Sequence, residues 1–190
     1  IDANYFQHIP YLEQFSSDHK LDLAVSARVH IEPMGIYSRK ATDIGSLQSG
    51  LTIAIPNDVT NGGRALALLE NAGLIHLKDG VGIKATVQDI EDRGGFRIVT
   101  LDAAQLPRVL DDPTVTAAVI NGNYALEAGL NPVNDAIFLE GADSPYTNVL
   151  VVKAGREKDK SLELLATKLA SPETADFIRE KYAGAVVPVN

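Results

Sequence analysis

Short apolar runs rich in β-branched residues alternate with helix-like segments along the chain, and this alternation is the feature that most restricts its fold. The run LTIAIPND at 51–58 is typical of a buried strand, and a helical pattern at 60–73 follows it, with Gly73 as a C-terminal stop. Further strands are expected at 21–31, 96–101, 115–121, 135–141 and 147–155, and helices at 11–20, 103–112, 124–129 and 158–184, the last divided at Ser171-Pro172. Strands that alternate with helices predict an α/β fold with mainly parallel sheets.

The composition excludes several classes of protein. The 190 residues suffice for one large domain or two small lobes. The net charge of −8 and the absence of a basic stripe argue against nucleic-acid binding. No apolar run reaches the roughly 20 residues of a membrane span. The chain has no Cys, its four His show no metal-ligand spacing, and it has no G-x-S-x-G, H-E-x-x-H or P-loop motif.

The segment IPNDVTNGGRALALLENAG combines a strand end, a polar turn and a helix start near Thr60 or Asn61. Helix N-termini favour anions, and Gly62 and Gly63 remove side chains where a ligand could touch the backbone. Arg64 adds a positive charge that opposes the helix dipole unless something compensates it.

A carboxylate held through two parallel hydrogen bonds would compensate Arg64, which makes this residue a candidate for binding an acidic ligand. The alternative is a solvated Arg64 beside Asp58, with Thr60 as an ordinary helix cap.

Two Asn residues lie at strand ends. Asn121 ends the apolar strand at 115–121, at a place where open α/β sheets bind ligands, although Asn-Gly is also an ordinary turn. Asn148 enters the strand at 147–155 after the Ser144-Pro145 turn, although Asn is depleted in strands. Each is a candidate ligand residue, with turn chemistry as the alternative.

The stretch NYFQH places Tyr5, Phe6 and His8 together near the start of the chain. Flat aromatic rings suit an aliphatic chain or a thioether sulfur, and His8 could add a hydrogen bond. The alternative is a core aromatic pair beside a surface His.

The segment GVGIKA at 80–85 matches the dinucleotide fingerprint G-x-G-x-x-A, and Asp102 lies where a ribose-binding acid belongs. An NAD-binding oxidoreductase that uses Gly80, Gly82 and Asp102 is therefore the alternative function. Lys78-Asp79 separates the strand from the first Gly, and the possible helix at 86–92 is short, so a surface Gly turn accounts better for this motif.

Five stretches occur together in the order and spacing of one protein family: DANYFQHIPYLEQ (2–14), IAIPNDVTNGGRALALLENAGLIHLKDGVG (53–82), QLPRVLDD (105–112), AAVINGNYA (117–125) and SPYTNVLVV (144–152). On these motifs the chain resembles the methionine-binding lipoproteins of the NlpA family, which are substrate-binding proteins of methionine ABC importers. The similarity extends over essentially all 190 residues.

The resemblance implies a two-lobe α/β fold of the periplasmic-binding-protein type II, with the ligand in the cleft. The first lobe would combine residues 1–32 with 145–190, and the second lobe, 33–144, would be continuous. Family members begin with a signal peptide, a lipidated Cys and two strand–helix units. At roughly 30 residues per βαβ unit, about 60 residues of the first lobe are expected to be missing from this chain.

The resemblance also implies the function: a protein without enzymatic activity or cofactor that binds L-methionine, D-methionine or a Met-containing dipeptide and delivers it to a membrane permease. Arg64 would hold the carboxylate, Asn121 and Asn148 the polar head, and Tyr5, Phe6 and His8 the side chain. The protein would be extracytoplasmic and lipid-anchored when full length. A chain lacking part of one lobe could instead pair its exposed strand edges with another chain, as a domain-swapped or aggregated form.

Overall fold

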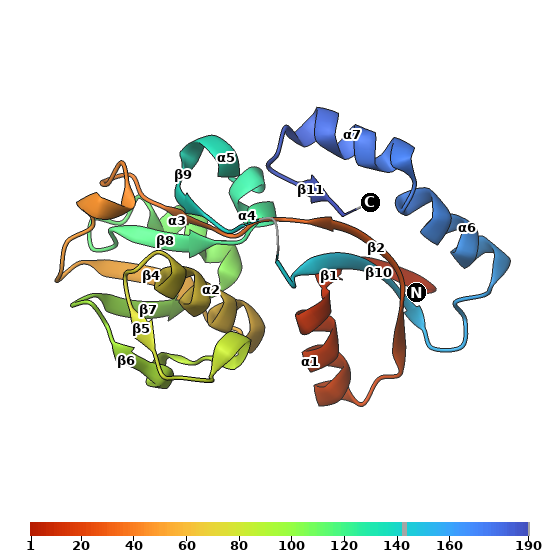
Figure 1. The fold of residues 1–190 in the computed structure, drawn as a ribbon, viewed down its shortest axis with the longest axis horizontal. Helices are drawn as coiled ribbons and strands as arrows, with labels where there is room; N and C mark the ends of the chain where they lie inside the picture. The colour runs from red at the N-terminus through yellow and green to blue at the C-terminus, as the bar shows by residue number, and fades with distance from the viewer. Residues whose placement is uncertain (142–143, 190) are drawn as a thin grey trace. The chain divides into compact units, whose positions relative to one another are not determined.

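The computed structural model describes residues 1–141 and 144–189, and the chain divides into two compact units (Figure 1). The first unit comprises Ile1–Glu32 and Gly141–Asn190, and the second comprises Pro33–Glu140. The second unit is thus continuous, while the first is made from both ends of the chain. The second unit was predicted to end at residue 144, and in the structure it ends at Glu140.

The first unit contains a four-stranded sheet in the order β1-β10-β2-β11. Its strands are β1 (Ala3–His8), β2 (Leu23–Ile31), β10 (Thr147–Lys153) and β11 (Val187–Pro188). β10 pairs antiparallel with β1 on one side and with β2 on the other, and β11 pairs antiparallel with β2.

The expectation of mainly parallel sheets is therefore wrong for the first unit. β1 and β2 run in the same direction and are joined through a helix, as the alternating pattern predicts. However, β10 returns from the second unit and lies between them in the opposite direction. A strand–helix pattern read along the chain does not reveal that a later strand separates two earlier ones.

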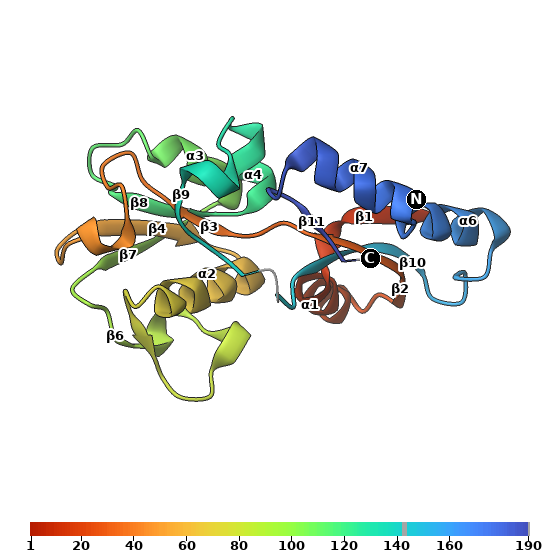
Figure 2. The ribbon, with the colours of Figure 1, turned by 45° about the horizontal axis from the view of Figure 1, so that its top comes forward.

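Helices cover both faces of this sheet (Figures 1 and 2). They are α1 (Ile9–His19) on one side, and α6 (Lys160–Leu169) and α7 (Pro172–Tyr182) on the other. Leu12 of α1 packs against Val149 and Val151 of β10. Ser171 caps α7 by accepting from the N–H of Thr174, and Pro172 occupies the first helical turn, which confirms the predicted division of 158–184 into two helices.

The second unit contains a five-stranded sheet in the order β7-β4-β8-β3-β9. Its strands are β3 (Gly35–Tyr37), β4 (Thr52–Pro56), β7 (Arg97–Leu101), β8 (Ala117–Ile120) and β9 (Ala136–Leu139). β4 lies parallel to β7 and β8, whereas β3 pairs antiparallel with β8 and β9. The parallel arrangement that the sequence predicts thus holds for the three strands β7, β4 and β8.

Both faces of β4 are buried, which explains its apolar run at 53–56. Ile53 and Ile55 face a core that includes Leu66 of α2, whereas Ala54 faces a second core that includes Leu106 of α3. Side chains of a strand alternate between the two faces, so a strand covered on both sides has few polar positions. The one polar residue of β4, Thr52, is its first residue and is itself buried.

The helices of the second unit are α2 (Val59–Asn71), α3 (Leu106–Val109), α4 (Gly122–Glu127) and α5 (Pro132–Asp135), and shorter 3-10 turns lie at Ile44–Ser46, Gly82–Lys84, Val87–Asp89 and Ala103–Gln105. A small two-stranded sheet pairs β5 (His76–Leu77) with β6 (Ile90–Asp92). The possible helix at 86–92 is therefore wrong: this segment is a 3-10 turn followed by a strand.

The start of α2 also differs from the expectation. The helix begins at Val59 rather than near Thr60 or Asn61, and Asp58 is its cap, because the Asp58 carboxylate accepts from the N–H of Asn61 at 2.9 Å. Gly73, with a φ of +72°, directly follows the C-cap and confirms the predicted stop.

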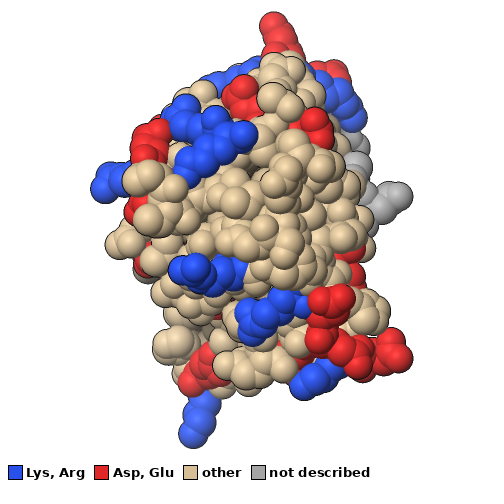
Figure 3. Space-filling view, turned by 90° about the vertical axis from the view of Figure 1, so that its left-hand side faces the viewer, with Lys and Arg blue, Asp and Glu red and all other residues tan. Residues whose placement is uncertain are grey.

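Charged groups on the face seen in Figure 3 are of both signs and surround an uncharged central area. On that face the basic side chains do not join into a stripe that would follow a phosphate backbone. Within 1–141 and 144–189, no helix combines the length and the apolar character that crossing a membrane requires.

Candidate functional site

Two connections at one edge of the second sheet carry the polar residues that the sequence singled out. β4 and β8 are parallel neighbours, so their carboxyl ends lie at the same edge. α2 begins after β4, and Asn121 follows β8. Asn121 Nδ2 donates to Asn61 Oδ1 at 2.7 Å, and Asn61 and Arg64 share a face of α2, three residues apart. Arg64 and Asn121 therefore both lie near the start of α2.

Arg64 is 3% exposed and is compensated by a carboxylate of its own chain. Its Nε donates to Oε1 of Glu140 at 3.0 Å, and its Nη2 donates to Oε2 of the same residue. Glu140 Oε2 also accepts from the N–H of Met34 at 3.2 Å. The alternative of a solvated Arg64 beside Asp58 is therefore wrong, because Asp58 caps the helix and Glu140 neutralises the Arg.

The absence of a side chain at Gly63 has a structural cause, which is close packing against another segment of the chain. A Cβ on Gly63 would lie 2.3 Å from the carbonyl oxygen of Ile83, in the loop that contains the Gly80 motif. A Cβ on Gly62 would lie 3.1 Å from the carbonyl oxygen of Pro56. The absent side chain at Gly63 thus lets a backbone segment of the same chain pack on α2.

The Asn121 side chain is 9% exposed, and its Oδ1 has no hydrogen-bond partner among the residues that the structure describes. Asn121 occupies the N-cap position of α4 but makes no capping hydrogen bond with its side chain. An N-cap Asn ordinarily uses its oxygen to accept from the helix. The turn-forming alternative therefore does not account for this side chain.

In the first unit, His30 of β2 connects two of the predicted residues. The Tyr5 hydroxyl hydrogen-bonds to Nδ1 of His30, and Asn148 Nδ2 lies 3.3 Å from Nε2 of the same ring. His30 Nε2 is also 3.1 Å from Oε1 of Glu32. Burial, reinforced by the charge of Glu32, raises the pKa of the Tyr5 hydroxyl, so this group keeps its proton.

The other two candidates of the first unit, His8 and Phe6, both contact the ring of Tyr11. Nδ1 of the buried His8 accepts from the N–H of Tyr11 at 3.1 Å, which caps α1. The rings of Phe6 and His8 both lie edge-to-face with Tyr11, at centroid distances of 5.9 Å and 6.1 Å, and His8 also contacts the ring of Tyr146. Phe6 remains 64% exposed. It is therefore not a core aromatic, whereas His8 is not a surface residue.

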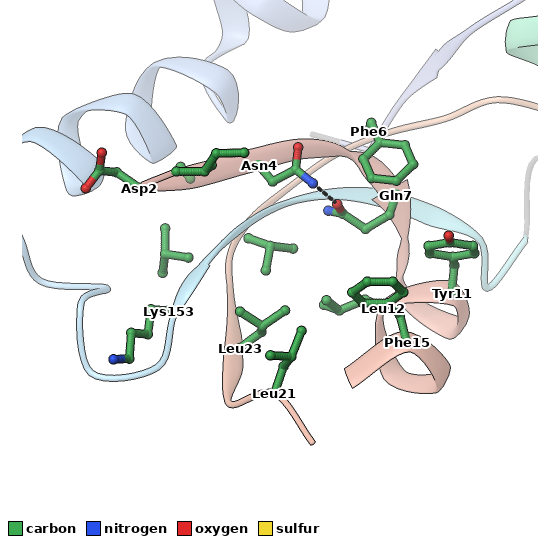
Figure 4. A pocket seen from close by; sticks show the side chains of 14 residues that line it. Asp2, Asn4, Phe6, Gln7, Tyr11, Leu12, Phe15, Leu21, Leu23 and Lys153 are labelled. Carbon is green, nitrogen blue, oxygen red and sulfur yellow. Dashed lines mark hydrogen bonds between the residues drawn. The ribbon is translucent and has the colours of Figure 1, made fainter. Parts of the chain in front are cut away.

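A pocket of about 350 Å³ lies within the first unit, between β1, β10 and α1 (Figure 4). Phe6 lies at its border with Tyr11 and Phe15, and Leu21 and Leu23 line another part. The pocket is predominantly apolar and its lining includes none of Tyr5, His8, Asn148, Arg64 and Asn121. It is therefore suited mainly to apolar groups, although Asp2 and Lys153 also belong to its lining.

The structure adds four residues that sequence reasoning missed: Tyr11, His30, Asn61 and Glu140. Asn61 could have been found from its place three residues before Arg64, and Tyr11 from its place three residues after His8. Glu140 lies 76 residues from Arg64, and no local pattern marks their pairing.

The dinucleotide interpretation of Gly80, Gly82 and Asp102 is wrong. A 3-10 turn at Gly82–Lys84 follows the glycines, so no α-helix starts there to receive a pyrophosphate. The preceding strand, β5, has only two residues. Asp102 caps the turn at Ala103–Gln105 by accepting from the N–H of Ala104 at 2.9 Å.

Titratable side chains do not gather into a metal-binding cluster of three or more His, Asp or Glu in the described part of the chain.

The chain is similar to known proteins along its whole length. Residues 1–190 match the family described as NlpA lipoprotein. The D-methionine-binding lipoprotein MetQ of Escherichia coli K12 is 41% identical over 188 residues, which are 98% of this chain and 69% of that protein.

Two solved structures share the fold. A nutrient-binding protein from Burkholderia cenocepacia, bound to methionine, has a TM-score of 0.95 and 42% identity over 100% of this chain and 80% of its own. A periplasmic substrate-binding protein of an ABC transporter from Coxiella burnetii has a TM-score of 0.93 and 41% identity over 100% of this chain and 79% of its own.

Proposed function

Because the chain belongs to the NlpA lipoprotein family, we propose that it binds methionine as the substrate-binding component of an ABC importer. The observation that carries the proposal is the methionine-bound Burkholderia protein, whose fold this chain matches from end to end. The Escherichia coli relative, named for binding D-methionine, supports the same ligand. These relatives are named for binding rather than for a reaction, so the role is recognition and delivery.

The polar head of methionine is assigned to Arg64, Asn121 and Asn148. Arg64 is assigned to the ligand carboxylate because a buried guanidinium binds carboxylates through charge-assisted hydrogen bonds, as it does with Glu140. Glu140 fixes the orientation of the guanidinium plane, which reduces the conformational entropy lost on binding. Asn121 and Asn148 are both buried, and each can donate and accept.

The side chain of methionine is assigned to Tyr5, Phe6 and His8, to which the structure adds Tyr11. Phe6 is the exposed member of this group, so it has apolar surface left to bury against a ligand. A thioether sulfur against an aromatic ring contributes roughly 0.3–1.5 kcal/mol per contact.

The names of the relatives also suggest where the protein acts. The match to a lipoprotein family and to a periplasmic substrate-binding protein supports an extracytoplasmic location. The proposal also includes attachment to the membrane through a lipid anchor and docking on a permease–ATPase complex.

Titration calorimetry with L-methionine, D-methionine and a Met-containing dipeptide tests the function. Saturable binding of methionine, with alanine and serine much weaker and NAD without effect, is the expected result. A version extended to the length of the Escherichia coli relative serves as the companion sample, because this chain covers 69% of that protein. Failure of both samples to bind any of the methionine ligands would overturn the proposal.

A further inference from the structure

We propose that Asp58 and Asn61 are positioning residues that hold the Asn121 side-chain amide with its oxygen toward the ammonium group of the ligand. The inference rests on the proposed function, because it states which group of methionine Asn121 receives. It concerns only the second unit, and three side chains carry it.

The first link is the contact between Asp58 and Asn61. The side-chain nitrogen of Asn61 lies 3.1 Å from each carboxylate oxygen of Asp58, and the backbone N–H of Asn61 donates to Oδ1 at 2.9 Å. An ionised carboxylate accepts hydrogen bonds and donates none. The atom of the Asn61 amide that faces Asp58 must therefore be the NH₂ group, and its oxygen must point the other way.

The second link passes this orientation to Asn121. Oδ1 of Asn61 lies 2.7 Å from the side-chain amide of Asn121. Because that oxygen only accepts, the group of Asn121 that faces it must be the NH₂ group. The direction of the Asn121 amide thus follows from the charge on Asp58 rather than from a choice between two similar rotamers.

The consequence is a buried acceptor at the end of the chain of hydrogen bonds. Asn121 is 9% exposed, its Oδ1 has no partner in the described part of the protein, and its side chain does not cap α4. A buried acceptor without a donor is costly, so such a group is expected to be satisfied by something that binds. An ammonium group, with three donors and no acceptor, is the complementary partner.

This arrangement explains how the site would select an amino acid over a simple carboxylic acid. A ligand carboxylate brought to Asn121 Oδ1 would place two acceptors against each other, whereas Arg64, on the same face of α2 as Asn61, offers donors. The carboxylate is therefore directed to Arg64 and the ammonium group to Asn121.

The first experiment compares L-methionine with its analogue that lacks the amino group, 4-(methylsulfanyl)butanoate, by titration calorimetry. Asp58→Asn keeps a good helix cap but replaces one carboxylate oxygen by an NH₂ group that faces Asn61. Asn61 and then Asn121 are expected to turn over, so methionine should bind about tenfold more weakly while the analogue changes little. Thr60→Ala is the matched control. Thr60 Oγ1 donates to Asp58 Oδ1 at 3.1 Å but lies outside the chain of hydrogen bonds from Asp58 through Asn61 to Asn121, which we call the relay.

The second experiment reverses the direction of the relay. Asn121→Asp places a carboxylate against Oδ1 of Asn61, which is unfavourable while Asp58 holds the Asn61 amide. Adding Asp58→Asn lets that amide turn and donate to the new carboxylate. The same Asp58→Asn change should therefore weaken methionine binding in the parent and strengthen it in the Asn121→Asp background. Without ligand, Asp58→Asn should likewise lower the unfolding temperature of the parent and raise that of the Asn121→Asp variant.

The outcomes separate the two proposals. If the unaltered protein does not bind methionine, the proposed function fails, and the unfolding temperatures still test the relay. Two results would overturn the positioning role in a protein that binds methionine. In the first, Asp58→Asn changes the affinity for methionine in the same direction in both backgrounds. In the second, it weakens the binding of methionine and of the analogue equally.

Discussion

The polar candidates of the second unit and the aromatic candidate Phe6 of the first unit are in opposite states. In the second unit, Arg64 and Asn121 are buried and already oriented by partners of their own chain, Glu140 and Asn61. In the first unit, Phe6 is largely exposed and its ring meets Tyr11 at the edge of an apolar pocket. Charged and polar recognition requires groups held in place before the ligand arrives, whereas apolar recognition gains from surface that the ligand itself covers.

The largest expected effect is at Arg64, which tests whether the second unit carries the charge recognition. Arg64→Ala should weaken methionine binding by about 100-fold or more, because it removes a buried partner of the carboxylate. It should also lower the free energy of unfolding by about 3–5 kcal/mol, since Glu140 is left without its cation. Calorimetry and thermal unfolding measure the two effects separately.

The double variant Arg64→Ala with Glu140→Gln is the control, because it removes the unpaired charge as well. Stability should recover substantially while binding remains lost. A double variant that binds methionine like the parent would remove Arg64 from the site.

The next effect concerns the scaffold of the second unit and should not depend on ligand. Gly63→Ala introduces a methyl group that meets the Ile83 carbonyl oxygen at 2.3 Å, so we expect a loss of roughly 1–3 kcal/mol in unfolding free energy. Gly62→Ala is the matched variant, with a closest contact of 3.1 Å, and should lie within about 1 kcal/mol of the parent. Equal unfolding midpoints for the two variants in urea would contradict the packing argument.

A smaller effect is expected at Asn148, the buried polar candidate of the first unit. Asn148→Ala should weaken methionine binding about tenfold, the value of one hydrogen bond to a charged group. The variant also removes the contact with His30, so His30→Gln is the comparison that separates loss of the ligand contact from loss of local order. Full affinity in Asn148→Ala would restrict polar recognition to the second unit.

The smallest effect is expected at Phe6, and it should appear as selectivity. Phe6→Ala should weaken methionine binding about two- to tenfold and leave the binding of alanine or serine nearly unchanged. Because Phe6 is 64% exposed, unfolding should change by less than about 0.5 kcal/mol. A proportional loss for all three amino acids, measured in parallel titrations, would show that Phe6 does not contact the side chain.

Local patterns predicted the elements well where one segment determines its own structure. The helices at α2 and α7, the strand β4 and the stop at Gly73 all follow from capping residues and apolar periodicity. The pairing of distant segments could not be predicted in this way. Neither the insertion of β10 between β1 and β2 nor the ion pair of Arg64 with Glu140 leaves a local trace.

The candidate residues show the same difference between local patterns, which could be predicted, and distant partners, which could not. Arg64 was marked by its unfavourable charge at a helix start, and Asn148 by its place in a strand, but the partners that orient them lie far away in the sequence. The interpretation of Gly63 as a ligand contact missed the loop that packs on it, because packing between separate segments is a property of the folded chain.

The position of β10 determines the order in which the molecule is completed during synthesis. The strand that pairs with both β1 and β2 emerges from the ribosome only after residues 33–140, all of the second unit. The second unit has its contacts within one continuous stretch and is free to fold first, whereas the first unit waits for its middle strand. A chain that ends at residue 140 should therefore leave β1 and β2 without a partner, while the inserted unit keeps its own cooperative unfolding transition.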